Sequence, residues 1–167
     1  KLLAESFQQV ISRNDGAQVK VEIVQRLLRR LVRVAQRRHL EMRDLAATFL
    51  AVAVSDSQFI AIHVGDGVIG YVKDGELKVI SAPDNDEFAN QTTFVTSESA
   101  ATTMRLLRGS LSGVTGFVLM SDGPANSLFD HRSNTLATAC RKVIELVASA
   151  SPFSVPGYKY QIRRLLD

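Results

Sequence analysis

The stretch "TFLAVAVSDSQFIAIHVGDGVIGYVKDGELKVIS", residues 48–81, decides the fold because it predicts four strands in succession. Residues 46–54 and 59–64 are nearly continuous apolar runs separated by "SDSQ". A strand with one solvent-exposed face would alternate polar and apolar residues. These two runs therefore predict a hairpin whose strands are covered on both faces.

A second hairpin follows directly. Residues 68–72 and 77–81 flank "KDGE", in which Asp74 and Gly75 form a typical turn dipeptide. The polar segment after it, residues 82–94, predicts an exposed loop that is long enough to suggest a functional role.

Helical patterns lie on both sides of these strands. They cover residues 2–13, about 18–43, 134–150 and 158–167, and 98–109 in part, and a further short buried strand is predicted at 117–120. The order of helices, buried strands and helices favours an α+β layered fold, with antiparallel sheet covered by helices, over an alternating dinucleotide-binding domain.

Length and composition set the class of protein. At 167 residues, with 46% apolar and 22% charged residues, the chain predicts one globular domain with a real core. Its N-terminus lacks a signal-peptide layout, and no apolar run is long enough to cross a bilayer. The single cysteine, Cys140, lies in a helical pattern and predicts a buried, inert thiol in a reducing cytoplasm.

Positive charge gathers at the start of the chain, since residues 1–43 carry a net charge of +6 and the remainder −3. The helix predicted at 18–43 has a stripe for burial and an opposite basic face. The stripe is Val21, Val24, Leu28, Leu31 and Ala35, and the basic face is Arg26, Arg29, Arg30, Arg33 and Arg37. A solvated face is the common explanation, and a module that binds nucleic acid or an acidic partner is the alternative.

Two buried strands end in an aspartate followed by glycine: "AIHVGDG" at Asp66 and "FVLMSDG" at Asp122. If the strands are neighbours, both carboxylates emerge at one sheet edge, where a cation must offset their repulsion. Carboxylates suit Mg²⁺ and Mn²⁺. Simple turns remain the alternative. At a strand end, we expect His63 to be a hydrogen-bonded structural side chain.

Residues 48–81 resemble the middle of the metal-dependent Ser/Thr protein phosphatases of type 2C, which carry a strand hairpin, a "hVGDS" turn and a "DGEL" hairpin. "EFANQTTFVTS", residues 87–97, is similar to the segment that follows in a bacterial branch of that family. "GFVLMSDGPANSLFD" is similar to its "hhhxSDG" motif. The resemblance covers about residues 1–150.

The resemblance implies a four-layer α-β-β-α sandwich with two antiparallel sheets. It also implies a centre of two or more Mn²⁺ or Mg²⁺ ions, where a metal-activated water attacks a phosphoserine or phosphothreonine of a phosphoprotein substrate. Asp122 matches a metal ligand, and Asp66 matches an aspartate that holds a further metal or its waters. The attacking group is water, so no side chain is assigned as catalytic. The residues expected to support the two aspartates are Gly65, Gly67, Ser121 and Gly123, and those expected in the flap that controls substrate access are Asn90 and Thr92.

The chain also departs from the family pattern. Gly67 and Val68 stand where the family usually has Ser-Arg. The "DGxG" motif expected before Lys1 and the "DD" pair expected beyond Asp167 are missing. We therefore expect one phosphatase-like domain over residues 1–167, partial at both ends, that binds metal weakly and catalyses poorly alone. A pseudophosphatase that binds a partner without turnover is the second hypothesis.

Overall fold

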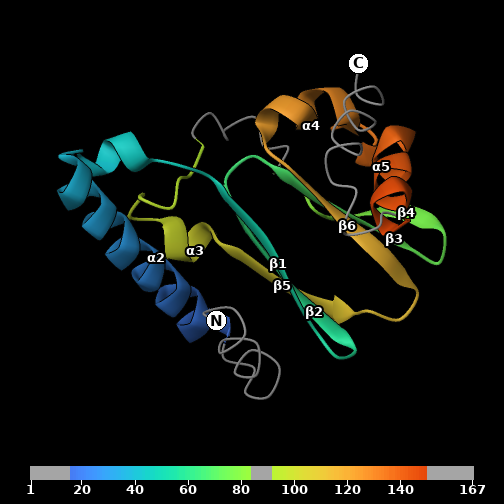
Figure 1. Ribbon diagram of the computed structural model, residues 1–167, viewed down its shortest axis with the longest axis horizontal. Helices are drawn as coiled ribbons and strands as arrows, with labels where there is room; N and C mark the ends of the chain where they lie inside the picture. The colour runs from blue at the N-terminus through green and yellow to red at the C-terminus, as the bar shows by residue number, and fades with distance from the viewer. Residues whose placement is uncertain (1–15, 84–91, 150–167) are drawn as a thin grey trace.

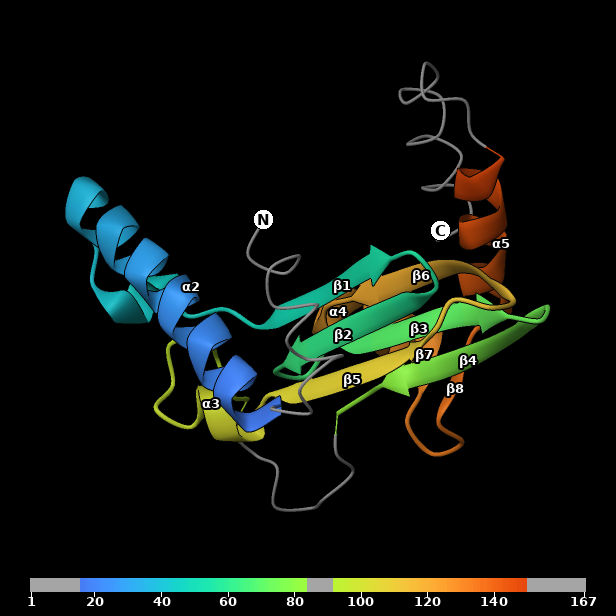
Figure 2. The ribbon, with the colours of Figure 1, turned by 90° about the horizontal axis from the view of Figure 1, so that it is seen from below.

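The computed structural model describes residues 16–83 and 92–149, which form four layers (Figures 1 and 2). Two three-stranded antiparallel sheets lie in the middle. The first sheet has the order β1 (Phe49–Ser55), β2 (Gln58–Val64) and β5 (Arg105–Ser110), and the second has the order β4 (Glu76–Ser81), β3 (Val68–Lys73) and β6 (Val114–Met120). Helices cover the outer face of each sheet, which confirms the predicted α-β-β-α sandwich.

Strand β2 explains why the first hairpin is apolar on both faces. Its Ile60 and Ile62 pack against the helices outside the first sheet, whereas Phe59 and Ala61 pack with Ile69 of the second sheet. Successive side chains of a strand point to opposite faces, so a strand between two apolar layers needs a continuous apolar run. The predicted two-sided burial is therefore confirmed for β2, whereas β1 is only partly buried and its Val54 is 60% exposed.

The second hairpin, β3–β4, also forms as predicted. Asp74 and Gly75 at its turn have φ angles of +52° and +76°. Positive φ at both central residues is the backbone of the two-residue hairpin turn that Asp-Gly favours. Strand β6 pairs with the other edge of β3, so β3 is the central strand of the second sheet.

The segment 98–109 is partly helical, as expected, but its second half forms strand β5, which was not expected. Only α3 (Ala100–Thr103) is helical there, and Arg105–Ser110 forms a strand that pairs with β2 along its length. The local sequence contains two arginines and a threonine pair, so its strand character arises from pairing with a distant segment.

Helix α2 (Gly16–Arg38) covers the first sheet with Val19, Ile23 and Val24. Val21, predicted to be buried, is 38% exposed because at about 100° per residue it lies roughly opposite Val19 and Ile23.

The same helix ends earlier than expected. His39 has a φ angle of +53°, and the Leu40 amide donates to the Ala35 carbonyl at 2.9 Å. A left-handed residue with this backward hydrogen bond is a common helix stop.

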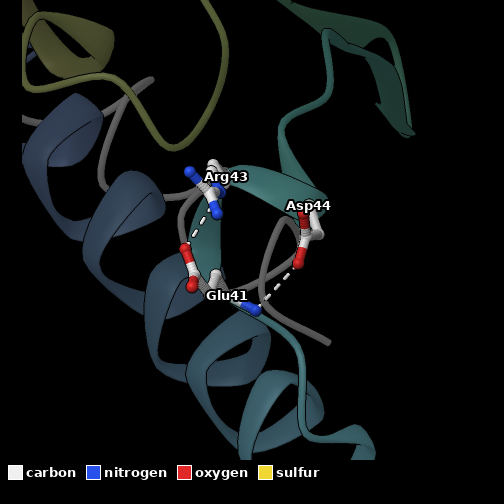
Figure 3. A network of polar contacts seen from close by, with 3 residues as sticks. All are labelled: Glu41, Arg43 and Asp44. Atoms are coloured by element: carbon white, nitrogen blue, oxygen red, sulfur yellow. Dashed lines mark hydrogen bonds and ion pairs between the residues drawn. The ribbon is translucent and has the colours of Figure 1, made fainter.

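A short 3₁₀ turn, η1 (Met42–Leu45), connects α2 to β1. The Glu41 amide donates to the Asp44 carboxylate at 2.9 Å, and the Arg43 and Glu41 side chains form an ion pair at 2.9 Å (Figure 3). Both members of the ion pair are well exposed, so it contributes little to stability.

The outer layer on the second sheet consists of α4 (Asp122–Leu128), the small hairpin of β7 (Phe129–Asp130) and β8 (Thr135–Leu136), and α5 (Thr138–Ala148). The segment after β6 is thus partly helical, and the helix predicted from residue 134 begins at Thr138. The helices predicted at 2–13 and 158–167 lie outside the described residues. Within the described ranges, no helix is long and apolar enough to cross a membrane.

Cys140 lies on α5 in the core against the second sheet and is 1% exposed. Burial raises the pKa of the Cys140 thiol. Because the thiolate is the reactive species, we expect the native protein to react with a disulfide reagent at least ~100-fold more slowly than the guanidinium-unfolded protein. Rapid stoichiometric labelling of the folded protein would contradict this burial.

Candidate metal centre

Asp66 lies on the connection that crosses from the first sheet to the second. Strand β2 ends at Val64 and β3 begins at Val68, so Gly65, Asp66 and Gly67 form the whole link. Gly65 has a φ angle of +110°, and a Cβ there would lie 2.3 Å from Cγ2 of Thr48. Only glycine fits this backbone and this contact, so a side chain at position 65 would force the turn that carries Asp66 to move.

Asp122 lies just beyond the neighbouring strand, β6, and is the first residue of α4. Val68 pairs with Met120 in the β3–β6 register, and each aspartate stands two residues beyond that pair. Both carboxyl-bearing residues therefore leave the second sheet at the same end. The condition that β2 and β6 lie side by side is not met, because they belong to different sheets. Strand β3, which pairs with β6, instead brings the two aspartates to one end.

Gly67 explains how closely the two turns approach. A Cβ on Gly67 would lie 2.5 Å from the Met120 carbonyl oxygen and 2.5 Å from Cδ1 of Leu50. The link that carries Asp66 is thus packed directly on the backbone that leads to Asp122. These two contacts explain why position 67 is glycine in this chain, although the family usually has serine there.

The other two expected supporting residues are less constrained. A Cβ on Gly123 would meet nothing within 4 Å, so packing does not require glycine there. Ser121 is exposed and is the N-cap residue of α4.

The two aspartates differ in their surroundings. Asp122 is exposed, at the first position of α4, where its charge suits the helix N-terminus. Asp66 is half-buried, and its Oδ2 accepts a hydrogen bond of 2.8 Å from Thr92 Oγ1. Thr92, expected to act in substrate access, thus contacts Asp66 directly. Asn90 lies outside the described residues.

Polar groups from both sheets gather beside this turn. His63 is fully buried, with Nδ1 2.7 Å from Ser81 Oγ and Nε2 2.9 Å from the Gly65 carbonyl oxygen. Its expected role as a hydrogen-bonded structural side chain is confirmed. Arg105, which pairs with His63 across β2 and β5, donates to the Ala82 carbonyl. Arg105 was not predicted from the sequence. The feature that could have indicated it is a charged residue placed directly before the apolar pair Leu106 and Leu107.

The chemical type of the ligands suits a hard cation, but the described residues supply few of them. Among residues 16–83 and 92–149, no group of three or more His, Cys, Asp or Glu side chains is placed to hold a metal ion. Asp66 and Asp122 offer carboxylate oxygens, the ligands that Mg²⁺ and Mn²⁺ prefer, and Mg²⁺ commonly uses one or two carboxylates with several waters. These two residues fit as part of a site.

Two antiparallel sheets between helical layers, with both aspartates at one end of the second sheet, define a sandwich of the phosphatase type. The family model described as protein phosphatase 2C matches residues 1–166, and the chain belongs to this family. A comparison with curated proteins gives no match.

Two solved structures show the same fold at low sequence identity. The serine/threonine phosphatase Stp1 from Staphylococcus aureus is 14% identical, with a TM-score of 0.51 over 98% of this chain and 62% of that chain. A bacterial serine phosphatase is also 14% identical, with a TM-score of 0.51 over 92% and 61%. The chain therefore spans about three-fifths of the length of these structures.

Proposed function

We propose that the protein is a metal-dependent phosphatase that hydrolyses phosphoserine or phosphothreonine in a phosphoprotein. In this proposal it acts in the bacterial cytoplasm and takes part in signalling. Its membership of the protein phosphatase 2C family supports phosphatase chemistry. The observation that carries the assignment to this site is that Asp66 and Asp122 leave adjacent strands at the same end. An edge with two carboxylates favours a shared cation, because repulsion between like charges is otherwise uncompensated.

The roles of the two aspartates differ in this proposal. Asp122, which is exposed, presents its carboxylate to solvent as a direct ligand of Mn²⁺ or Mg²⁺. Asp66, oriented by Thr92, holds a further ion or its waters. Bound metal supplies an activated water and neutralises charge on the phosphoryl oxygens. The contribution of the chain is to fix both carboxylates at one edge before the substrate arrives.

The domain assignment is part of the same proposal. Residues 1–167 belong to one phosphatase-like domain. The "DGxG" and "DD" motifs of the family do not occur in these residues and would complete the ligand set. On this basis residues 1–167 alone bind metal weakly and turn over slowly.

The direct test is phosphate release from a phosphothreonine peptide by the full-length protein, with Mn²⁺ and with EDTA. We expect activity that depends on Mn²⁺ and that returns when the metal is restored. Activity that is insensitive to EDTA would contradict metal dependence. A folded protein without any activity would favour the second candidate.

That second candidate is a pseudophosphatase that binds a phosphoprotein without hydrolysing it. The supporting observation is Gly67-Val68 in place of the family's Ser-Arg. The Val68 side chain is apolar and fully buried, so it offers no polar contact in the site. Retention of a phosphothreonine peptide without phosphate release would distinguish it from the enzyme.

The basic face of α2 gives a further prediction. Arg29 and Arg33 are exposed on the outer helical layer, as a solvated face requires. We expect Arg29→Glu combined with Arg33→Glu to leave phosphatase activity within about twofold of wild type, because exposed charges contribute little. A large loss would show that this face positions a substrate or partner. Nucleic-acid binding with a log–log salt slope of several units would instead support the remote alternative of a nucleic-acid-binding module.

A further inference from the structure

His63 is the one histidine of the central strands, and it lies on the face of β2 that points between the two sheets. Residues 59, 61 and 63 are two positions apart on β2 and therefore share one face, and Phe59 and Ala61 pack on the second sheet. Its ring is fully buried. One side of the ring contacts Ser81 at the end of β4, and the other contacts the Gly65 carbonyl, two residues further along its own chain.

The chemistry of the partners decides the direction of these hydrogen bonds. A backbone carbonyl only accepts, so Nε2 of His63 carries a proton and donates it to Gly65 at 2.9 Å. In the neutral ring Nδ1 is then the acceptor, and the Ser81 hydroxyl donates to it at 2.7 Å. The ring is therefore fixed at both nitrogens in a single tautomer.

The contact at Nε2 reaches Asp66 through one rigid unit. The Gly65 carbonyl and the Asp66 amide belong to the same peptide plane, so an anchor on the carbonyl restricts the orientation from which Asp66 emerges. Without such an anchor, glycine on each side would leave this peptide unusually free to rotate. Thr92 then orients the carboxylate itself at 2.8 Å.

We propose that His63 is a positioning residue for Asp66. It anchors the peptide between Gly65 and Asp66, while Ser81 fixes the ring from the second sheet. The proposal rests on the proposed function, since it treats Asp66 as part of a metal centre. Residues that orient metal ligands through a hydrogen bond commonly change metal affinity about 10–100-fold when they are lost.

Three variants of the full-length protein separate positioning from simple packing. In His63→Gln the amide nitrogen comes close to the place of Nε2 and keeps the donor to Gly65. In His63→Asn the amide comes close to the place of Nδ1 and loses that donor. Ser81→Ala removes the contact between the sheets and leaves the contact to Gly65.

The readouts are the Mn²⁺ dissociation constant, measured by electron paramagnetic resonance of free Mn²⁺, and the melting temperature without metal. We expect His63→Asn to weaken Mn²⁺ binding about 10–100-fold. We expect His63→Gln to restore it to within about threefold of wild type. Ser81→Ala should lower the melting temperature and weaken Mn²⁺ binding less than His63→Asn does, because the contact to Gly65 remains. Equal affinity in His63→Asn and His63→Gln, with both folded, overturns the proposal.

Two further measurements complete the test. If both His63→Asn and Asp66→Asn retain wild-type Mn²⁺ affinity, the assignment of Asp66 to a metal centre fails. If Asp66→Asn loses affinity and His63→Asn does not, only the positioning role of His63 fails. If His63→Asn does not fold, imidazole NMR of the wild-type protein decides. The protonated Nε2 signal of His63 should shift on Mg²⁺ addition in wild type but not in Asp66→Asn, and no shift in wild type overturns the proposal.

Discussion

Asp122→Asn is expected to lower Mn²⁺-dependent hydrolysis of a phosphothreonine peptide by the full-length protein about 100- to 1,000-fold. The substitution keeps the shape of the side chain and removes the charge that binds the cation. Stabilisation by a catalytic metal is worth several kcal/mol, and each 1.36 kcal/mol is a factor of ten in rate. Asp122 is exposed, so the melting temperature without metal should change by only a few degrees.

Asp74→Asn is the matched control for this experiment. Asp74 lies in the turn at the opposite end of β3 from Asp66, with a φ angle of +52° that asparagine also adopts readily. Its activity should equal that of wild type. Full activity in Asp122→Asn, or an equal loss in both variants, would show that Asp122 is not a ligand.

Gly67→Ser is expected to destabilise the protein by about 1–3 kcal/mol, the usual cost of overpacking. Serine is the residue that the family usually has here, yet its Cβ would lie 2.5 Å from the Met120 carbonyl oxygen. Relief of that contact requires the end of β6 or the link that carries Asp66 to move, and Asp122 lies two residues beyond the end of β6. We therefore expect the family's own residue to lower both stability and activity in this protein.

Urea unfolding of Gly67→Ser beside Gly123→Ser measures the effect. A Cβ on Gly123 meets nothing within 4 Å, so Gly123→Ser should be as stable as wild type. Wild-type stability in Gly67→Ser would mean that the link between the sheets tolerates a side chain. The close packing of the Asp66 turn on β6 would then be wrong.

Much of the fold follows from local sequence. The two hairpins were predictable because continuous apolar runs predict buried strands and Asp74-Gly75 predicts a tight turn. Strand β5 was not predictable in this way, because its strand character comes from pairing with β2, far away in sequence. Helix α4 contains Gly123 and Pro124, which are typical turn residues, but proline is tolerated in the first turn of a helix.

The candidate site was predictable in its residues and not in its geometry. Asp66 and Asp122 stand out as carboxylates at the ends of apolar strands, but the order of strands in a sheet is a long-range property. The neighbour of β6 is β3, whereas the sequence argument depended on β2 lying beside β6. The contact of Thr92 with Asp66 and that of His63 with Ser81 join residues 26 and 18 positions apart. No local pattern specifies such pairs.

The central claim is that Asp66 and Asp122 belong to one metal centre at one end of the second sheet. The most direct measurement is anomalous X-ray scattering from crystals of the full-length protein soaked in Mn²⁺. The account predicts an anomalous peak between the two turns, with an Asp122 carboxylate oxygen coordinated directly and Asp66 coordinated directly or through a water. Ordered Mn²⁺ elsewhere in the crystal, with none at this edge, would contradict it.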